Sequence, residues 1–162
     1  MSLIVRPALF PRDAETVGAL VGGYLRQTEA EKGERGLAEE TFPERYGREI
    51  HDPETAFDGR VVLVAALDGE DVGLIVSTAT ASGTELSRFW TDPRGRGRGV
   101  GSALLTAALR TVARPVRLSV WEWREPALRM YRAAGFDIVP SWDGRPGLVC
   151  LELTSATPSG HR

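Results

Sequence analysis

A run of alternating arginine and glycine is the part of this chain best suited to chemistry. The sequence reads Arg-Gly-Arg-Gly-Arg-Gly-Val-Gly from Arg94 to Gly101, and Ser102 then leads into apolar residues spaced like one face of a helix. Glycine permits unusual backbone angles and a close approach of the main chain, and the first N–H groups of a helix have no partner within it. A strand, such a turn and a helix start together make an anion site, for which phosphate oxygens are the natural ligand.

Three other kinds of glycine-rich segment share features with this turn. A Walker A loop ends in Gly-Lys-Ser or Gly-Lys-Thr, and there is no lysine between Arg94 and Ser102. The G-x-G-x-x-G fingerprint of dinucleotide-binding folds fails on spacing. A flexible arginine–glycine segment that contacts RNA stays open as an alternative, although the flanking strand and amphipathic helix argue against it.

The turn resembles the R/Q-x-x-G-x-G/A signature of the GNAT superfamily of acyl-CoA-dependent N-acetyltransferases. The stretch 96–101 matches this signature and so does 94–99; we prefer the later register because the run from Gly99 to Leu105 looks like the family's usual entry into the helix. On that register the resemblance implies that seven consecutive residues hold the pyrophosphate of coenzyme A through their backbone. These are Arg96, Gly97, Arg98, Gly99, Val100, Gly101 and Ser102.

A later strand and helix resemble the family's second coenzyme A segment. In that segment a strand is followed by N-x-x-A-x-x-x-Y-x-x-x-G-F, and Ala127, Tyr131, Gly135 and Phe136 fall in place. Arg124 stands where the family commonly has asparagine. The resemblance implies that Arg124, Ala127 and Tyr131 contact the coenzyme.

The strand before the glycine turn completes the expected coenzyme site. The resemblance implies that its main chain near Trp90 and Thr91 pairs with the pantetheine amides of coenzyme A. The same resemblance sets the thioester carbonyl against a backbone N–H, which stabilises the charge that develops on the carbonyl oxygen.

Two side chains are candidates for moving protons during acetyl transfer. The phenol of Tyr131, with an ordinary pKa of about 10, can donate a proton to a departing thiolate, whose reference pKa is nearer about 8.5. Packing of its helix against the sheet is the alternative role. Glu85 is the candidate base for the acceptor amine, because family members often carry a carboxylate near this position; a solvated glutamate at a strand end is equally compatible. Glu122 is the second choice of base.

The pattern of apolar residues predicts a mixed α/β fold that positions these segments. Strands are expected at 3–6, 61–67, 72–80, 85–91, 116–121, 136–139 and 148–153. Helices are expected from Asp13 as N-cap with a weak point at Gly22-Gly23, within 39–50, after the glycine turn, and from Pro126 to Gly135. The resemblance implies a GNAT-like sheet of six or seven mainly antiparallel strands with helices on both faces, splayed between the fourth and fifth strands to admit coenzyme A.

Composition narrows the function further. The 162 residues are 42% hydrophobic and 26% charged, which is typical of a globular chain; one acetyltransferase domain is expected over 1–153 and a polar tail over 154–162. The 20 basic and 22 acidic residues give a formal net charge of −2, so no broad positive field favours nucleic acid.

The cysteine count and the hydropathy pattern exclude further classes of protein. One cysteine, Cys150, excludes an intramolecular disulfide and a cysteine-rich zinc site. No apolar run is long enough to cross a bilayer and no signal-peptide pattern opens the sequence, so a cytoplasmic location is expected.

These observations predict an N-acetyltransferase that passes the acetyl group of acetyl-CoA directly to a primary amine, with no metal, nucleic acid or membrane. The acceptor is expected to be a small-molecule or peptide amine of unspecified identity, and a homodimer is compatible with the sequence. A non-catalytic acyl-CoA-binding sensor is the alternative. The resemblance sets three residues beside the acceptor: Tyr24, Glu29 and Glu31. Three tryptophans either line an apolar acceptor pocket or pack at the core and rim: Trp121, Trp123 and Trp142.

Overall fold

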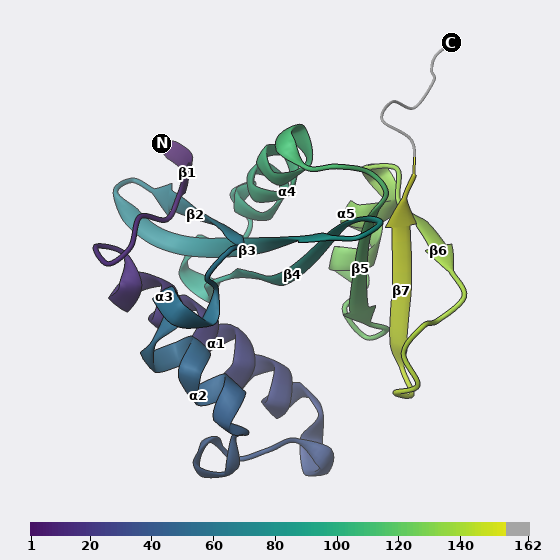
Figure 1. Ribbon diagram of the computed structural model, residues 1–162, viewed down its shortest axis with the longest axis horizontal. Coiled ribbons are helices and arrows are strands. Elements are labelled where there is room, and N and C mark those ends of the chain that lie inside the picture. Colours follow the sequence, from purple (N-terminus) through teal and green to yellow (C-terminus); the bar gives the residue numbers. More distant parts are fainter. Residues whose placement is uncertain (155–162) are drawn as a thin grey trace. The chain divides into compact units, whose positions relative to one another are not determined.

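A computed structural model describes residues 1–154 of the chain, so all but the first residue of the expected polar tail lies outside the described residues. Three α-helices follow the first strand, three strands come next, and two helices then alternate with the remaining strands (Figure 1). The strands are β1 (Leu3–Pro7), β2 (Val61–Leu67), β3 (Glu70–Thr80), β4 (Gly83–Thr91), β5 (Val116–Trp121), β6 (Asp137–Val139) and β7 (Leu148–Leu153). The α-helices are α1 (Ala14–Glu31), α2 (Glu44–His51), α3 (Pro53–Ala56), α4 (Val100–Thr111) and α5 (Glu125–Ala133). Short 3-10 turns lie at Gly33–Arg35, Glu39–Thr41 and Pro93–Gly95.

The seven strands form one sheet in the order β1-β2-β3-β4-β5-β7-β6. β1 pairs antiparallel with β2, and β7 pairs antiparallel with both β5 and β6. β4 and β5 run parallel, with Thr84 opposite Val116 and Glu85 opposite Arg117. The predicted fold class, a mainly antiparallel mixed sheet, is therefore confirmed, and the number of strands is seven.

The chain divides into two compact units. The first comprises residues 1–76 and 88–110, and the second comprises residues 77–87 together with the chain from Thr111 onward. β3 passes between the units after Val76, and β4 returns between Ser87 and Arg88. The glycine-rich turn thus belongs to the first unit, and the second coenzyme segment belongs to the second.

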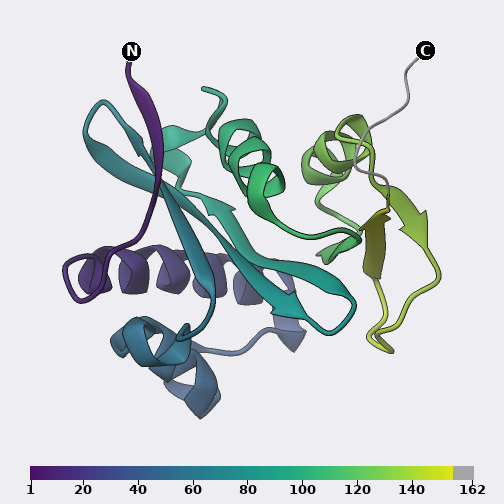
Figure 2. The same ribbon diagram turned by 45° about the horizontal axis from the view of Figure 1, so that its top comes forward.

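In the first unit, helices cover both faces of the strands. Apolar residues of α1 pack against every second residue of β2 and β3; the buried cluster is Val17, Leu20, Val21, Leu25, Phe57, Val62, Val64, Leu74 and Val76. Alternation along a strand turns the intervening residues to the other face, where a Cβ added at Gly73 would lie 3.0 Å from side-chain atoms of Val100 and Leu104 in α4. Figure 2 shows α4 across the strands from α1.

The expected weak point in the first helix is wrong, since α1 runs without a break from Ala14 to Glu31. Its glycines serve close packing instead. A Cβ at Gly18 would collide with the carbonyl of Ile50, and a Cβ at Gly23 would collide with the ring of Trp90. The packing free energy of the whole helix outweighs the lower helix propensity of glycine, about 1 kcal/mol per residue.

Asp13 precedes α1 as predicted, but its side chain does not cap the helix. Its carboxylate instead accepts hydrogen bonds from the guanidinium of Arg6, at 2.8 Å, and from the backbone N–H of Leu9, at 2.7 Å. The bond to Arg6 lowers the pKa of Asp13, and the Leu9 N–H adds to that effect against the opposing effect of burial. Asp13 therefore fastens β1 to the start of α1.

The second unit is built on β5 and β7, which pair along their whole length from Val116 opposite Leu153 to Trp121 opposite Leu148. Phe136 follows α5 and is fully buried, with its ring edge-on to that of Tyr131 at 5.8 Å. Cys150 on β7 is buried. Among the helices of residues 1–154, none is long and apolar enough to cross a membrane.

Candidate functional site

The turn after β4 is anchored at its first half. The carboxylate of Asp92 accepts a hydrogen bond from the backbone N–H of Arg94 at 2.9 Å, and Pro93 begins the 3-10 turn that follows. Gly95 is buried against β3, where a Cβ would come within 2.8 Å of a methyl group of Val72. This glycine is therefore required by close packing of the turn on the strand.

The second half of the turn forms an open backbone cradle. Gly97 and Gly99 have φ angles of +78° and +82°, which L-amino acids with a side chain rarely adopt. A Cβ at either position would meet no atom within 4 Å, so these glycines meet a conformational need and leave space on that side. The carbonyl of Gly99 accepts the N–H of Ala103 at 3.0 Å, and α4 begins at Val100.

This cradle fits a pyrophosphate. The first N–H groups of α4 have no carbonyl one turn earlier in the helix to bind, and the positive end of the helix dipole lies there. These groups belong to Val100, Gly101 and Ser102, which are three of the residues that the sequence assigns to the coenzyme. Backbone amides beside open space can thus surround phosphate oxygens without requiring any one side chain.

The three arginines of the turn have different surroundings. Arg94 pairs with Asp92 at 3.0 Å, which together with the Arg94 backbone N–H overcomes the effect of burial and lowers the pKa of Asp92. Arg96 turns back, donating from Nε to the carbonyl of Thr91 at 2.9 Å and from Nη2 to Gln27 at 2.6 Å. Arg98 is exposed and has no hydrogen bond or ion pair to any residue of the described chain. Its guanidinium is therefore the one of the three that can turn toward an anion without losing a protein partner.

The end of β4 is fixed to helix α1. Nε1 of Trp90 donates a 2.8 Å hydrogen bond to Oε1 of Gln27, and the Trp90 ring packs over Gly23. Arg96 lies 6.0 Å from the centre of the same ring. Sequence reasoning missed Gln27, although it lies one turn along the helix from Tyr24, a residue already expected to border the acceptor.

A partly buried ion pair lies farther back on β4, and sequence reasoning missed it as well. Arg88 donates to both carboxylate oxygens of Glu49 in α2, at 2.6 and 3.0 Å, with side chains only 22% and 12% exposed. Burial by itself lowers the pKa of Arg88, but the bonds and charge of Glu49 outweigh it and leave that pKa raised. Arg88 has a φ of +51°, a left-handed conformation that costs a residue with a side chain about 1–2 kcal/mol.

Residues expected beside the acceptor prove to be engaged with their neighbours. Glu29 is 3% exposed, and its carboxylate accepts hydrogen bonds from Lys32 at 2.7 Å and from the backbone N–H of Leu37 at 3.0 Å, so it holds the connection after α1 in place. Glu31 accepts a 2.7 Å hydrogen bond from Gln27. Tyr24 lies with its ring centre 5.5 Å from the guanidinium carbon of Arg88.

In the second unit, the predicted coenzyme residues lie on and just before α5. Arg124 directly precedes the helix and donates its N–H to the carbonyl of Trp121 at 3.0 Å. Ala127 lies in the first turn. Tyr131, two turns into the helix, is 6% exposed, and packing against Phe136 accounts for part of that burial.

The candidate bases are both exposed residues of the second unit. Glu85 lies in the part of β4 that pairs with β5, opposite Arg117, whose side chain binds Glu152 at 2.8 Å. Glu122 follows β5 and donates its N–H to the carbonyl of Gly147 at 2.8 Å.

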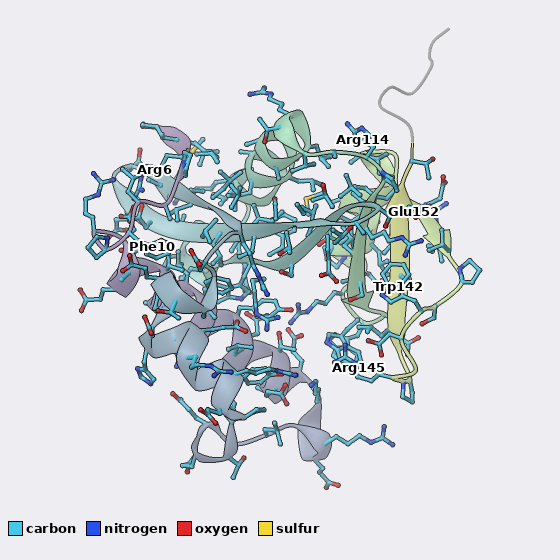
Figure 3. All side chains as sticks on the ribbon, in the orientation of Figure 1. Arg6, Phe10, Arg114, Trp142, Arg145 and Glu152 are labelled. Carbon is cyan, nitrogen blue, oxygen red and sulfur yellow. The ribbon has the colours of Figure 1, made fainter. Side chains whose placement is uncertain are left out.

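The three tryptophans of the second unit make specific ring contacts. Trp121 and Trp123 stack with ring centres 4.9 Å apart, and the guanidinium of Arg145 lies 5.5 Å from the ring centre of Trp121. Trp142 lies 5.1 Å from the guanidinium of Arg117. Trp142 and Arg145 both come from the connection between β6 and β7 (Figure 3). Each of these rings therefore packs against a guanidinium or another ring of the same unit.

The model of the acetyltransferase (GNAT) family matches residues 31–136, which is more than half of the chain. The chain belongs to the GNAT family. The match runs from the end of α1 through the glycine turn to Phe136, so both segments that carry the sequence resemblance lie within it. The predicted family is confirmed, and acetyl-CoA is the co-substrate of GNAT acetyltransferases. No group of three or more His, Cys, Asp or Glu side chains within residues 1–154 is placed to hold a metal ion.

Solved GNAT structures share the fold at low sequence identity. The PaiA N-acetyltransferase of Thermoplasma acidophilum, in complex with coenzyme A, is 22% identical with a TM-score of 0.74, covering 96% of this chain and 100% of that one. An acetyltransferase from Thermus thermophilus is 22% identical with a TM-score of 0.68, covering 94% and 96%. An aminoglycoside 6'-acetyltransferase type Ii is 18% identical with a TM-score of 0.67, covering 93% and 96%. No curated protein sequence matches the chain.

Proposed function

We propose that this GNAT protein transfers the acetyl group of acetyl-CoA to a primary amine of a small molecule or peptide, by direct attack and in the cytoplasm. The observation that carries the proposal is the cradle formed by Gly97 and Gly99, which have positive φ and open space where a side chain would lie, and by the start of α4. Family membership supplies the donor. The acceptor class comes from the resemblance to N-acetyltransferases.

Coenzyme recognition is assigned first to the cradle. The backbone from Arg96 to Ser102 would bind the pyrophosphate, and Arg98 would add positive charge. Arg96 would contribute its backbone and hold the turn through Gln27, since its side chain is already bonded to protein. The strand end at Trp90 and Thr91 would pair with the pantetheine amides. From the second unit, Arg124, Ala127 and Tyr131 would add contacts.

The chemistry needs two proton movements. The amine nitrogen must be unprotonated to form its bond to the thioester carbonyl carbon; the C–S bond then breaks and the acetyl group stays on nitrogen. One proton leaves the nitrogen, and Glu85 is proposed to accept it directly or through water, with Glu122 as second choice. One proton reaches the sulfur, and Tyr131 is proposed to donate it. Because donor and amine are held together, no acyl-enzyme is required.

A sensor that binds acyl-CoA without an acceptor is the second candidate. The buried ion pairs of Glu29 with Lys32 and of Glu49 with Arg88 favour the enzyme over the sensor. They hold the connection after α1 and helix α2 beside residues that the resemblance sets near the acceptor, and an ordered surface there suits the binding of an acceptor.

Binding and turnover are measured separately to test the proposal. Calorimetry with coenzyme A and acetyl-CoA should give saturable binding to one site per chain. Incubation of acetyl-CoA with a panel of primary amines should release free thiol faster than in the absence of protein. Failure to bind acetyl-CoA would overturn the assignment as a whole. Binding without thiol release for any amine class, including polyamines, amino acids, aminoglycosides and peptides, would leave the sensor.

A further inference from the structure

Strand β4 contains a residue whose backbone departs from strand geometry. Arg88 has a φ of +51°, whereas regular strand residues have negative φ. A residue of this kind inside a strand is typical of a bulge, and bulges re-aim backbone groups beside active sites. The segment from Phe89 to Thr91 follows directly, and the proposed function sets the thioester against this segment.

The side chain of Arg88 shows what holds this conformation in place. Its guanidinium binds both oxygens of Glu49, 39 residues earlier in the chain, and lies over the ring of Tyr24. A bidentate pair fixes both the position and the plane of the guanidinium. The left-handed backbone conformation is thus tied to helix α2 by two hydrogen bonds and to α1 by a ring contact.

Helix α2 packs on α1 and on the core, and the ion pair adds a link to β4. Tyr46 and Ile50 are half-buried against the core cluster, and the carbonyl of Ile50 lies beside Gly18 of α1. Glu49 is the α2 side chain that the structure bonds to β4. Loss of its charge removes a link between the helix and the strand as well as the partner of a buried cation.

We propose that Glu49 is a positioning residue, which acts through Arg88 to hold the left-handed bulge of β4 and thereby aligns the backbone after it with the acetyl group. The inference rests on the proposed function and adds a residue to it. Glu49 contacts neither coenzyme nor the reacting atoms; its effect passes through the backbone of residue 88. Helix α2 and the strand that the proposed function sets against the acetyl group are therefore coupled.

Two double variants separate this role from simple stabilisation. Arg88→Ala/Glu49→Gln and Arg88→Gly/Glu49→Gln both lack the ion pair and the buried charges. Alanine disfavours positive φ, whereas glycine adopts it readily, so the two variants differ mainly in the backbone conformation that they allow. The readout is the ratio of the dissociation constants of coenzyme A and acetyl-CoA, measured by calorimetry. The two ligands share the pantetheine arm and differ in the acetyl group, so the ratio isolates the contacts of the acetyl group.

Wild-type protein is expected to bind acetyl-CoA more tightly than coenzyme A. The alanine variant should lose most of that preference, by about tenfold relative to the glycine variant. A change in how the strand holds the pantetheine arm affects both ligands and leaves their ratio unchanged. If the alanine variant does not fold, the single variant Glu49→Gln takes its place, and restoration of the preference by Arg88→Gly is the supporting result.

Equal acetyl preference in the alanine and glycine variants would overturn the inference, and so would a wild-type protein with no preference for the acetyl group. A merely structural pair would lower the melting temperature of both double variants and leave the ratio unchanged in both. None of these results affects the proposed function, which fails if acetyl-CoA does not bind or if no amine class releases free thiol from it. The two failures are therefore distinguishable.

Discussion

The guanidinium of Arg96 donates a 2.6 Å hydrogen bond to Oε1 of Gln27, 69 residues earlier in the chain. The same oxygen accepts the indole N–H of Trp90 at 2.8 Å. One amide oxygen on α1 thus joins the glycine-rich turn to the end of β4. The signature arginine is bonded to protein, so the proposed function assigns the neutralisation of a bound pyrophosphate to the backbone amides and to Arg98.

Arg98 should therefore carry the side-chain contribution to coenzyme binding. Arg98→Gln is expected to weaken the affinity for coenzyme A about threefold to tenfold and to reduce its dependence on salt, because one charge leaves the phosphate site. Titration calorimetry at two salt concentrations measures both effects. Arg94→Gln is the matched control, since Arg94 is held by Asp92. A larger loss for Arg94→Gln than for Arg98→Gln would contradict this assignment.

The cradle glycines provide a test of backbone conformation. Gly97→Ala and Gly99→Ala should each lower affinity for coenzyme A at least about tenfold, because alanine disfavours positive φ and the amides would turn away from the phosphates. Gly59 has a φ of +79° and, like the cradle glycines, no atom within 4 Å of an added Cβ. Gly59→Ala should then cost similar stability, measured by denaturant unfolding, without loss of affinity. Equal affinity losses at all three positions would show that global destabilisation is responsible.

Tyr131→Phe distinguishes proton donation from packing. The ring contact with Phe136 survives the substitution, so the folded state and the affinity for acetyl-CoA are expected to change little. The rate of acetyl transfer should fall about 10²-fold, since the thiolate loses its proton donor. Single-turnover thiol release measures the rate. An unchanged rate would assign Tyr131 to packing alone.

Glu85→Gln tests the proposed base. Glutamine keeps the shape of the side chain but does not accept a proton, so kcat/KM is expected to fall about 10²-fold and to lose its decline toward acid pH. The pH–rate profile of Glu122→Gln serves as the comparison. If Glu122→Gln shows this loss and Glu85→Gln does not, the base is Glu122; unchanged profiles in both would remove these carboxylates from the mechanism.

Asp13 makes the free energy of unfolding depend on pH in the acid range. Its pKa is lowered in the folded state, chiefly by Arg6, so the unfolded chain takes up the proton first as the pH falls. The stabilisation is complete above the ordinary aspartate pKa of about 3.9 and is lost as the pH falls through the folded value. Asp13→Asn should cost about 2 kcal/mol at pH 7 and show a flatter pH dependence. Denaturant unfolding from pH 3 to 7 checks this; parallel curves for both proteins would contradict it.

Much of the architecture could be predicted from local sequence. The strand at Val116–Trp121 is found with its predicted bounds, because alternating apolar residues and a preceding proline define it without outside help. The glycine-rich turn was also identifiable from spacing, since positive φ at two glycines and a helix start are local properties. The weak point predicted at Gly22-Gly23 is wrong because helix propensity describes an isolated helix. In the folded chain, the ring of Trp90 packs in the space beside Gly23.

The sequence by itself determined the family, the coenzyme and the backbone cradle, because these depend on residues that follow one another along the chain. Tertiary structure alone decided which side chains hold the site. Gln27 meets Arg96 across 69 residues, and Glu49 meets Arg88 across 39. Such pairs leave no periodic pattern in the sequence, because the partners are brought together only when α1 and α2 pack on the strands. For Arg88, a charge removed from much of its water also requires an anionic partner.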